Sequence, residues 1–281
     1  VFSAGLPGTG QPKICSVRNF PQLDYKMEYG VFLGWYLTLT QAKAFRTIDL
    51  CCCVSNAVEE NLQKEFGLKN TKTVRNGVDN LFFTKPSPNE KKRARESLSL
   101  PVDSIIWLSS IGKDSRKNSD FIVKEFISFL DDNLNHILVF IGDGTLGGMC
   151  EDLSSHSSQV FFFGQTEDVR LFLHAADYFI SASKAEGMPN SVLEAMACGL
   201  PTFLSDIKPH IEVEKISPES TTLFSFYNEG ELEKKLLDFN FDTYEVQSNN
   251  AYVVANERLS SRVMSKSYQE IYSLLLESGE I

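Results

Sequence analysis

Residues 177–206 constrain the fold more than any other stretch, because they place one helical pattern between two apolar runs. The first run, Tyr178-Phe179-Ile180, is long enough for a buried strand, and a polar segment from Ser181 to Gly187 follows it. Apolar residues after Pro189 recur at helical spacing, which predicts a helix of roughly ten residues. The second run, 202–205, completes a βαβ unit, which is right-handed by strong default.

The start of the predicted helix, near Asn190, indicates an anion site. The first backbone amides of a helix have no acceptor within it, and the helix dipole is positive there, so phosphate is the anion we expect. Glu186 lies just before the helix and Glu194 inside it. A ligand that carries both phosphates and hydroxyls, such as a nucleotide sugar, satisfies the amides and the carboxylates. Two glutamates at this spacing also occur on ordinary solvated helix faces, so the spacing alone does not distinguish a ligand site from such a face.

The run from Glu186 to Pro201, EGMPNSVLEAMACGLP, resembles the signature of retaining glycosyltransferases of family 4, with its E-x7-E motif. The resemblance implies the GT-B fold of two Rossmann-like domains, in which the C-terminal domain holds most of the nucleotide-sugar donor. It implies that Glu194 holds the donor ribose and that Glu186 is a catalytic residue, which acts on the sugar or its positive partial charge. The other donor-binding residues that it implies in this run are Gly187, Met188, Asn190, Ser191 and Val192.

A basic segment, residues 109–118, follows the first predicted strand of the C-terminal half. Open α/β sheets bind ligands at the carboxyl ends of their strands. The segment resembles the family loop whose Arg and Lys neutralise the donor diphosphate. Lys117 matches that lysine as a catalytic cation, and Asn118 stands beside it. Lys113 takes the place of the arginine, although a lysine offers a point charge and not a bidentate fork. These residues are alternatively plain surface cations.

Two further strand-end loops, residues 141–144 and 164–166, resemble family segments beside the nucleobase. Simple turn chemistry explains their glycines equally well. In the N-terminal half, Arg18 ends a strand predicted over 13–17. In the family, this strand end often carries a histidine that faces the donor sugar. Arg18 is therefore either a sugar contact or a surface charge.

The predicted fold class is α/β of the GT-B type, with two Rossmann-like doubly wound domains. Residues 1–85 form a partial N-terminal, acceptor-side domain, and residues 86–281 form the donor domain with a closing C-terminal helix. Only about 85 residues precede the boundary, fewer than a Rossmann-like domain needs, so we expect that the N-terminal domain is incomplete. After residue 90, six apolar runs alternate with helical stretches, which predicts a complete doubly wound sheet.

One predicted helix lies in the N-terminal half, and a second is expected to pack against it. Residues 29–45 carry aromatic and apolar side chains at helical spacing, which indicates a core helix or, alternatively, one that faces an acceptor or a membrane. The final helix, about 260–276, has one apolar side and matches the family helix that packs back toward the N-terminal domain.

Composition excludes several classes of function. The 281 residues carry a net charge of −10, which disfavours a nucleic-acid partner. No apolar run reaches the ~18 residues of a membrane span, so we expect at most peripheral membrane contact. The cysteine spacings do not match a metal site, and unpaired thiols fit a cytoplasmic protein. The six cysteines are at positions 15, 51, 52, 53, 150 and 198.

The resulting hypothesis is a cytoplasmic retaining glycosyltransferase, peripheral at the inner face of the membrane, in polysaccharide or glycolipid biosynthesis. Its partners are a nucleotide sugar and a carbohydrate or lipid-linked saccharide acceptor. It needs no metal and no cofactor besides the donor substrate. One alternative is a non-catalytic nucleotide-sugar or carbohydrate binding protein derived from this fold. A weaker one is an enzyme without a sugar acceptor, such as a nucleotide-sugar epimerase.

Overall fold

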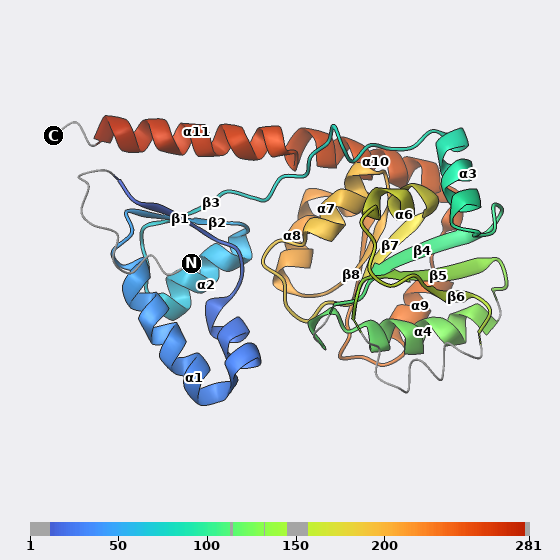
Figure 1. Ribbon diagram of the computed structural model, residues 1–281, viewed down its shortest axis with the longest axis horizontal. Coiled ribbons are helices and arrows are strands. Elements are labelled where there is room, and N and C mark those ends of the chain that lie inside the picture. The colour runs from blue at the N-terminus through green and yellow to red at the C-terminus, as the bar shows by residue number, and fades with distance from the viewer. Residues whose placement is uncertain (1–11, 113–114, 132, 145–156, 279–281) are drawn as a thin grey trace. The chain divides into compact units, whose positions relative to one another are not determined.

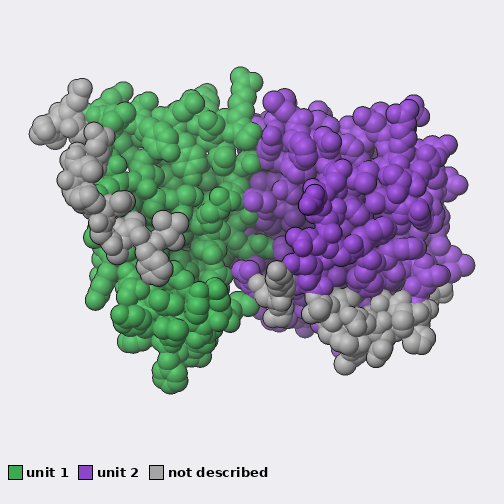
Figure 2. All heavy atoms as spheres, in the orientation of Figure 1, with its two compact units in different colours: residues 1–77, 186–188, 261–281 green, residues 78–185, 189–260 purple. Residues whose placement is uncertain are grey.

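The structure is a computed structural model that describes residues 12–112, 115–131, 133–144 and 157–278 (Figure 1). The chain forms two compact units (Figure 2). Unit 1 comprises residues 1–77, 186–188 and 261–281, and unit 2 comprises residues 78–185 and 189–260. Both units are α/β, and all strand pairs in their two sheets are parallel.

Unit 1 is built on a three-stranded sheet with the order β1-β2-β3. The side chain of Ser55 begins α2 by accepting a hydrogen bond from the Val58 amide, as the N-cap position favours. The C-terminal helix packs on this sheet, because Ile271 is buried in one cluster with Cys52 and Val74. The helix that the sequence predicts to pack back toward the N-terminal domain thus contacts the unit 1 sheet. The elements are β1 (Ile14–Val17), α1 (Pro21–Phe45), β2 (Leu50–Cys53), α2 (Asn56–Phe66), β3 (Thr71–Thr73) and α11 (Ser261–Ser278).

Helix α1 consists of two halves that meet at Gly30. Gly30 has φ 77° and ψ 177°, outside the helical region, and Figure 1 shows α1 as two helical segments joined by a bend. The halves pack closely, because a Cβ on Gly34 would lie 2.7 Å from the carbonyl oxygen of Tyr25. The Tyr25 hydroxyl also donates to the Gln41 amide oxygen at 3.0 Å. The helix predicted from residue 29 thus corresponds to the second half, and the first half begins earlier, at Pro21.

Unit 2 contains a six-stranded parallel sheet with the order β6-β5-β4-β7-β8-β9, the doubly wound arrangement expected for this half. All six predicted strands are present. The strands are β4 (Ile105–Ser110), β5 (His136–Ile141), β6 (Val160–Phe162), β7 (Tyr178–Ser181), β8 (Thr202–Ser205) and β9 (Thr221–Phe224). The chain order reverses between β4 and β7, and ligands of such sheets bind at that switch point.

Helices cover both faces of the unit 2 sheet (Figure 1). Helix α4 packs with α9 on one face, whereas the pairs α3 with α6 and α7 with α10 lie on the other. The helices are α3 (Pro88–Ser97), α4 (Ser119–Asp131), α6 (Val169–Ala175), α7 (Asn190–Ala197), α8 (Lys208–Ile216), α9 (Glu231–Leu237) and α10 (Tyr244–Arg258). The described residues of the unit also form three short 3₁₀ turns: η1 (Ser115–Lys117), η2 (Pro218–Ser220) and η3 (Phe241–Thr243).

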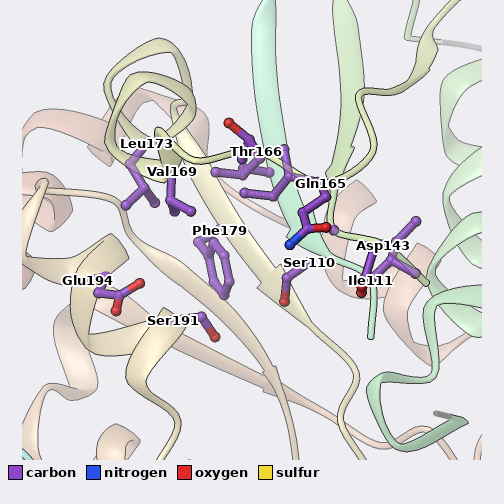
Figure 3. A pocket seen from close by; sticks show the side chains of 13 residues that line it. Ser110, Ile111, Asp143, Gln165, Thr166, Val169, Leu173, Phe179, Ser191 and Glu194 are labelled. Carbon is purple, nitrogen blue, oxygen red and sulfur yellow. The ribbon is translucent and has the colours of Figure 1, made fainter. Parts of the chain in front are cut away.

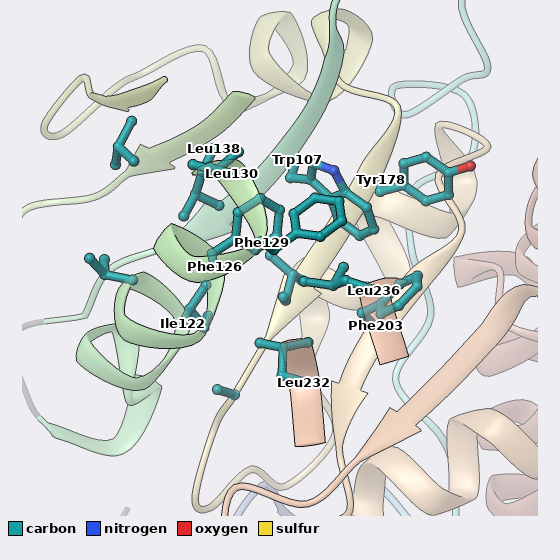
Figure 4. Packing of buried hydrophobic residues seen from close by; sticks show 14 of the residues in the cluster. Trp107, Ile122, Phe126, Phe129, Leu130, Leu138, Tyr178, Phe203, Leu232 and Leu236 are labelled. Carbon is teal, nitrogen blue, oxygen red and sulfur yellow. The ribbon is translucent and has the colours of Figure 1, made fainter. Parts of the chain in front are cut away.

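The core of unit 2 is centred on the fully buried Trp107 of β4 (Figure 4). Its indole stacks on Tyr178 with ring centroids 4.5 Å apart. Phe126 and Phe203 pack against it in T-shaped geometry, at centroid distances of 5.4 and 4.9 Å. Aromatic packing of this kind adds to the free energy gained by burial and holds β4 against its neighbours.

The division into units differs from the expected boundary near Lys85 at two points. It falls after residue 77, because the Val78 amide donates to the Leu259 carbonyl at 2.8 Å and Val78 pairs with Ser260, both in unit 2. It also assigns α11 to unit 1, whereas the expected donor domain ran to residue 281. Within the described part of the chain, no helix is long and apolar enough to cross a membrane.

Candidate functional site

A cavity of about 220 Å³ lies at the carboxyl end of the unit 2 sheet (Figure 3). Its walls are mostly apolar, and a few polar groups stand at its edges, a combination typical of small-molecule sites. The lining residues are Leu108, Ser110, Ile111, Ile141, Gly142, Asp143, Gln165, Thr166, Val169, Leu173, Phe179, Ser191 and Glu194. They come from β4, β5, β7, α6 and α7 and from the loops that follow β4, β5 and β6.

Close backbone contacts shape one wall of the cavity. The Ile111 amide donates to the Ile141 carbonyl, and the Gly142 amide donates to the Gly164 carbonyl, both at 2.8 Å. A Cβ on Gly142, whose φ is 128°, would lie 2.1 Å from the carbonyl oxygen of Ile111. Only glycine permits this approach. The two strand-end loops predicted beside the nucleobase therefore do reach the cavity, through residues 141–143 and 165–166.

The first turn of α7 supplies the opposite edge of the cavity. The amides of Val192 and Leu193 both donate to the Pro189 carbonyl, at 3.1 and 3.2 Å, so the helical hydrogen bonds begin there. The Ser191 amide precedes these bonds and has no acceptor within the helix. The Ser191 side chain lines the cavity. An anionic group of a ligand would meet the positive end of the helix dipole at this point.

Glu194 lies one turn further along α7, half-buried at the edge of the cavity (Figure 3). Burial raises the pKa of its carboxyl group, and the nearby Lys117 ammonium opposes this by lowering it. The site therefore joins a partly desolvated carboxylate to a cation, both within unit 2. Such a carboxylate is a strong acceptor for ligand hydroxyl groups.

Lys117 is held by the turn η1 and by its neighbours. The Lys184 amide, in the loop after β7, donates to the Arg116 carbonyl at 2.7 Å. Asn118 has φ 52°, in the left-handed region that asparagine tolerates, and its carbonyl accepts from the Phe121 amide at 3.1 Å. Asn118 thus turns the chain from η1 into α4. The predicted cation Lys113 lies outside the described residues.

The short segment 186–188 groups with unit 1, where three contacts hold it. The Ser55 hydroxyl donates to the Gly187 carbonyl at 2.7 Å, and the Asn76 side-chain amide donates to the Met188 carbonyl at 3.4 Å. Gly187 itself packs on the backbone of Arg18. The predicted residues Gly187 and Met188 are therefore buried backbone anchors, whereas Glu186 is half-buried and the Arg18 side chain is exposed.

The structure brings together only some of the predicted residues. Ser191 and Glu194 line the cavity, Lys117 interacts electrostatically with Glu194, and Asn190 is exposed at the start of α7. Val192 differs from its expected donor-binding role, because its side chain is fully buried and its amide already donates to Pro189.

Sequence reasoning missed the apolar lining residues Val169, Leu173 and Phe179. Val169 and Leu173 are four residues apart on α6, a spacing that indicates one helix face but does not tell a cavity wall from a core. Phe179 belongs to the apolar run of β7 and reads as a buried strand residue. No signal in the sequence distinguishes it from its neighbours.

Comparisons with known proteins place this site in context. Residues 103–239 match the model of the family described as Glycosyl transferases group 1. The matched segment contains every described residue of the cavity. A glycosyltransferase of Methanocaldococcus jannaschii, described as uncharacterized, is 26% identical over 199 residues, which are 68% of this chain and 47% of that protein.

A second relative has a more specific name. The Escherichia coli UDP-Gal:alpha-D-GlcNAc-diphosphoundecaprenol alpha-1,3-galactosyltransferase is 28% identical over 166 residues, 55% of this chain and 42% of that protein. The chain spans about half or less of the length of the curated relatives that it matches.

Solved structures match nearly the whole chain. The Anabaena protein HepE, solved with UDP and glucose, has a TM-score of 0.76 at 17% identity, over 93% of this chain and 71% of that protein. A sucrose-phosphate synthase from Thermosynechococcus elongatus has a TM-score of 0.77 at 17% identity, over 94% of this chain and 68% of that protein. At this identity the likeness shows the fold. The solved structures thus show the GT-B fold, and residues 103–239 are similar to group 1 glycosyltransferases.

Proposed function

We propose that this chain transfers a sugar from a nucleotide-diphosphate-sugar to an acceptor hydroxyl, with retention of anomeric configuration and without a bound metal ion. The observation that carries the proposal is the position of Glu194. Its carboxylate stands at the edge of an apolar cavity, in the first turns of α7, with Lys117 close enough to lower its pKa. A nucleoside diphosphate has a planar base with apolar faces, ribose hydroxyls and anionic phosphates. These match the cavity, the Glu194 carboxylate and the Lys117 cation in turn.

Each group then has a role. The base and ribose enter the cavity, where the Glu194 carboxylate accepts hydrogen bonds from the ribose hydroxyls. The diphosphate lies at the first turn of α7, against the backbone and side chains of Asn190 and Ser191, and Lys117 neutralises part of its charge. Lys113, outside the described residues, is proposed to share that charge. Glu186 is assigned to the transferred sugar.

In the proposed reaction, every bond that breaks or forms belongs to the donor or the acceptor, and no further reactant is needed. The bond between the anomeric carbon and the leaving phosphate oxygen breaks, and a bond from that carbon to the acceptor oxygen forms on the same face of the sugar. The leaving phosphate takes the proton of the acceptor hydroxyl. Negative charge grows on the diphosphate as it departs, so Lys117 and the dipole of α7 stabilise the transition state more than the ground state.

The proposed acceptor is a carbohydrate or a lipid-linked saccharide in polysaccharide or glycolipid synthesis, with the protein peripheral at the cytoplasmic face of the membrane. The name of the Escherichia coli relative specifies a diphosphoundecaprenol-linked acceptor and a UDP-linked sugar. The HepE structure contains UDP and glucose. These two names support the choice of substrate class.

Isothermal titration of the chain with UDP, GDP and ADP, each with and without magnesium, tests the proposal. One nucleotide should bind, and its affinity should not depend on magnesium. Glu194→Ala should weaken that binding about tenfold or more, since charged hydrogen bonds to two hydroxyls are lost. Glu257→Ala, an exposed glutamate of α10, is the matched control and should bind like the wild type.

Turnover needs a second measurement. Release of the nucleotide from its sugar, coupled to a new glycosidic bond of unchanged anomeric configuration, is the expected result. Tight binding of the nucleotide without any transfer to carbohydrate acceptors would favour a non-catalytic binding protein. Wild-type transfer by Glu194→Ala would overturn the assigned residues.

A further inference from the structure

Two cysteine side chains of unit 1 lie next to each other on neighbouring strands. Cys15 of β1 and Cys51 of β2 are register partners in the parallel sheet (Figure 1). Their sulfur atoms are 3.5 Å apart, within the distance of a thiol hydrogen bond. Neither residue lines the cavity of unit 2. The proposed transfer reaction therefore leaves this pair of nucleophilic groups without a role.

The backbone geometry of the pair suits a disulfide bond. Directly paired residues of neighbouring strands have Cα atoms about 4.8 Å apart, and disulfides join Cα atoms about 4.4–6.8 Å apart. An S–S bond is about 2.05 Å long, so the two sulfur atoms have to approach each other by about 1.5 Å. Rotation of the side chains about their Cα–Cβ bonds supplies a movement of this size without a change of strand register.

The two thiols differ in access and in acidity. Cys15 is partly exposed, whereas Cys51 is buried, as are the other described cysteines, Cys52, Cys53 and Cys198. The hydrogen bond with the Cys51 thiol lowers the pKa of Cys15, against a smaller opposing effect of burial, and the same contact raises the pKa of Cys51. The thiolate is the reactive form of cysteine. Cys15 is thus the group that an oxidant meets first, and Cys51 stands beside it in the position of a resolving thiol.

We propose that Cys15 and Cys51 form a dithiol that hydrogen peroxide oxidises to a reversible disulfide. The Cys15 thiolate attacks one peroxide oxygen, the O–O bond breaks, and the other oxygen leaves as water with the proton that the thiol released. The Cys51 thiol then attacks the sulfenic acid on Cys15. An S–S bond forms, the S–O bond breaks, and a second water carries away the Cys51 proton. The thiol pair thereby supplies the two electrons that reduce the peroxide. The inference stands on unit 1 alone and does not depend on the proposed transfer reaction.

A metal site explains the pair less well. Structural zinc sites have four protein ligands, and the described residues contain no group of three or more His, Cys, Asp or Glu side chains that could hold a metal ion. Cys53 is two residues from Cys51 on the same strand, but its thiol donates to the Cys51 carbonyl at 3.7 Å. Cys52 lies in the cluster that packs against α11, on the opposite face of β2. With two sulfur atoms and no third ligand among the described side chains, disulfide formation is favoured over metal binding.

A bond between these residues would join the two strands that flank α1 in the chain. The closed loop runs from Cys15 to Cys51 and contains the whole of α1. Disulfides at partly exposed positions are the ones that reductants reach most easily. The oxidised form should therefore return to two free thiols when dithiothreitol is added.

Peptide mapping after treatment with hydrogen peroxide tests the proposal. The remaining thiols are blocked with N-ethylmaleimide, and the chain is digested without reduction. Trypsin, which cuts after Lys and Arg, places Cys15 in the peptide 14–18 and Cys51 in the peptide 47–64. Mass spectrometry should find these two peptides joined, with fragmentation assigning the link to Cys51. Dithiothreitol should separate them again, and a non-reducing gel should show a monomer.

Variants separate the roles of the two thiols. Cys51→Ala should abolish the link and leave the sulfenic acid on Cys15 long enough for dimedone to trap it in the peptide 14–18. Cys15→Ala should abolish the link and leave no such adduct. Cys52→Ala changes a buried neighbour on the opposite face of β2, so it is the matched control and should form the link like the wild type. Circular dichroism checks that the variants fold, and the link in the wild type is measured without any substitution.

Three results would overturn the inference. The first is a wild-type chain whose peptides 14–18 and 47–64 stay separate after peroxide treatment. The second is a link that persists in Cys51→Ala or that Cys52→Ala removes, because Cys15 would then have another partner. The third is a link that appears only in a dimer on the non-reducing gel, because the bond would then join two chains and not two neighbouring strands.

Discussion

Gly187 packs directly on the backbone of Arg18, because a Cβ placed on Gly187 would lie 1.7 Å from the Arg18 carbonyl oxygen. Both residues belong to unit 1, and Gly187 is buried. The glycine that follows Glu186 is therefore required by a backbone contact, and not by the conformation of its own backbone. Any side chain at position 187 has to displace the strand end at Arg18.

Gly187→Ala should consequently destabilise unit 1 by about 3 kcal/mol, at the upper end of the usual cost of overpacking, since the opposing atom is backbone. Gly67→Ala is the matched control, because Gly67 has φ 66° but nothing within 4 Å of a Cβ. That change should cost only about 1 kcal/mol, the conformational penalty. Urea unfolding followed by circular dichroism compares the two. Equal costs would contradict the contact.

Ser55 joins the start of α2 to the same segment. Its hydroxyl accepts from the Val58 amide at 3.2 Å and donates to the Gly187 carbonyl at 2.7 Å. Ser55→Ala should remove a helix cap and also leave a buried carbonyl unsatisfied, at a total cost of about 2–4 kcal/mol.

The control for Ser55 is Ser87→Ala, which removes the exposed capping box of α3 alone. It should cost about 1 kcal/mol. If the two alanine variants lose the same free energy of unfolding, the hydrogen bond to Gly187 contributes nothing.

Sequence patterns located the strands of unit 2 well, because strands buried on both faces read as continuous apolar runs. All six residues of β5 are buried, for example, from His136 to Ile141. Boundaries were less certain where polar residues continue a strand. Ser109 and Ser110 extend β4 because they pair with β5, which no local pattern indicates. The first half of α1 was missed because alternating charges from Asp24 to Glu28 resemble a loop.

The sequence predicts those residues of the cavity that belong to one short motif. Ser191 and Glu194 come from a single helix start, so sequence spacing places them together. The contacts of Gly187 and Met188 come from Ser55 and Asn76, more than 100 residues away, and only the fold unites them. Leu173 and Phe179 line the cavity with side chains that have the character of core residues.

Lys117 should control the acid limit of ligand binding. The Glu194 carboxylate has to be ionised to accept from ribose hydroxyls, so affinity should fall as the pH drops through its pKa. Burial holds that pKa above its usual range, and Lys117 counteracts the shift. In Lys117→Gln the pKa should rise further, and the loss of affinity should begin at a higher pH.

A nucleoside is the right probe for this prediction, because Lys117 is also proposed to bind phosphate. Its Kd should be measured by titration between about pH 7.5 and about pH 4.5. Lys184→Gln, an exposed cation in the loop after β7, is the control and should keep the wild-type profile. Identical profiles for all three proteins would show that Lys117 does not lower the Glu194 pKa.

Asp177 anchors α3 to the sheet of unit 2. Its carboxylate accepts from Arg95 at 2.6 Å, from Lys91 at 2.5 Å and from the Ile106 amide at 2.7 Å. Asp177→Asn should cost about 3–5 kcal/mol, because it leaves two cations largely buried without their counter-charge. Glu96→Gln breaks the exposed pair with Lys92 and should cost at most about 0.5 kcal/mol. If urea unfolding shows that Asp177→Asn and Glu96→Gln lose similar free energies of unfolding, the proposed role of Asp177 is wrong.

His136 should make the core of unit 2 sensitive to acid. Burial lowers its pKa from 6.5 to about 4, against a smaller opposing effect of Asp177, and its Nδ1 accepts from the Trp107 indole at 3.1 Å. The folded pKa is below the unfolded one, so the stability due to neutral His136 is complete above about pH 6.5 and is lost as the pH falls toward about 4. At about pH 5 the loss should be roughly 2 kcal/mol.

His136→Asn keeps an acceptor for Trp107 but does not titrate. The difference in unfolding free energy between wild type and variant should therefore shrink or reverse by that amount between about pH 7.5 and about pH 5, and a constant difference would refute the assignment.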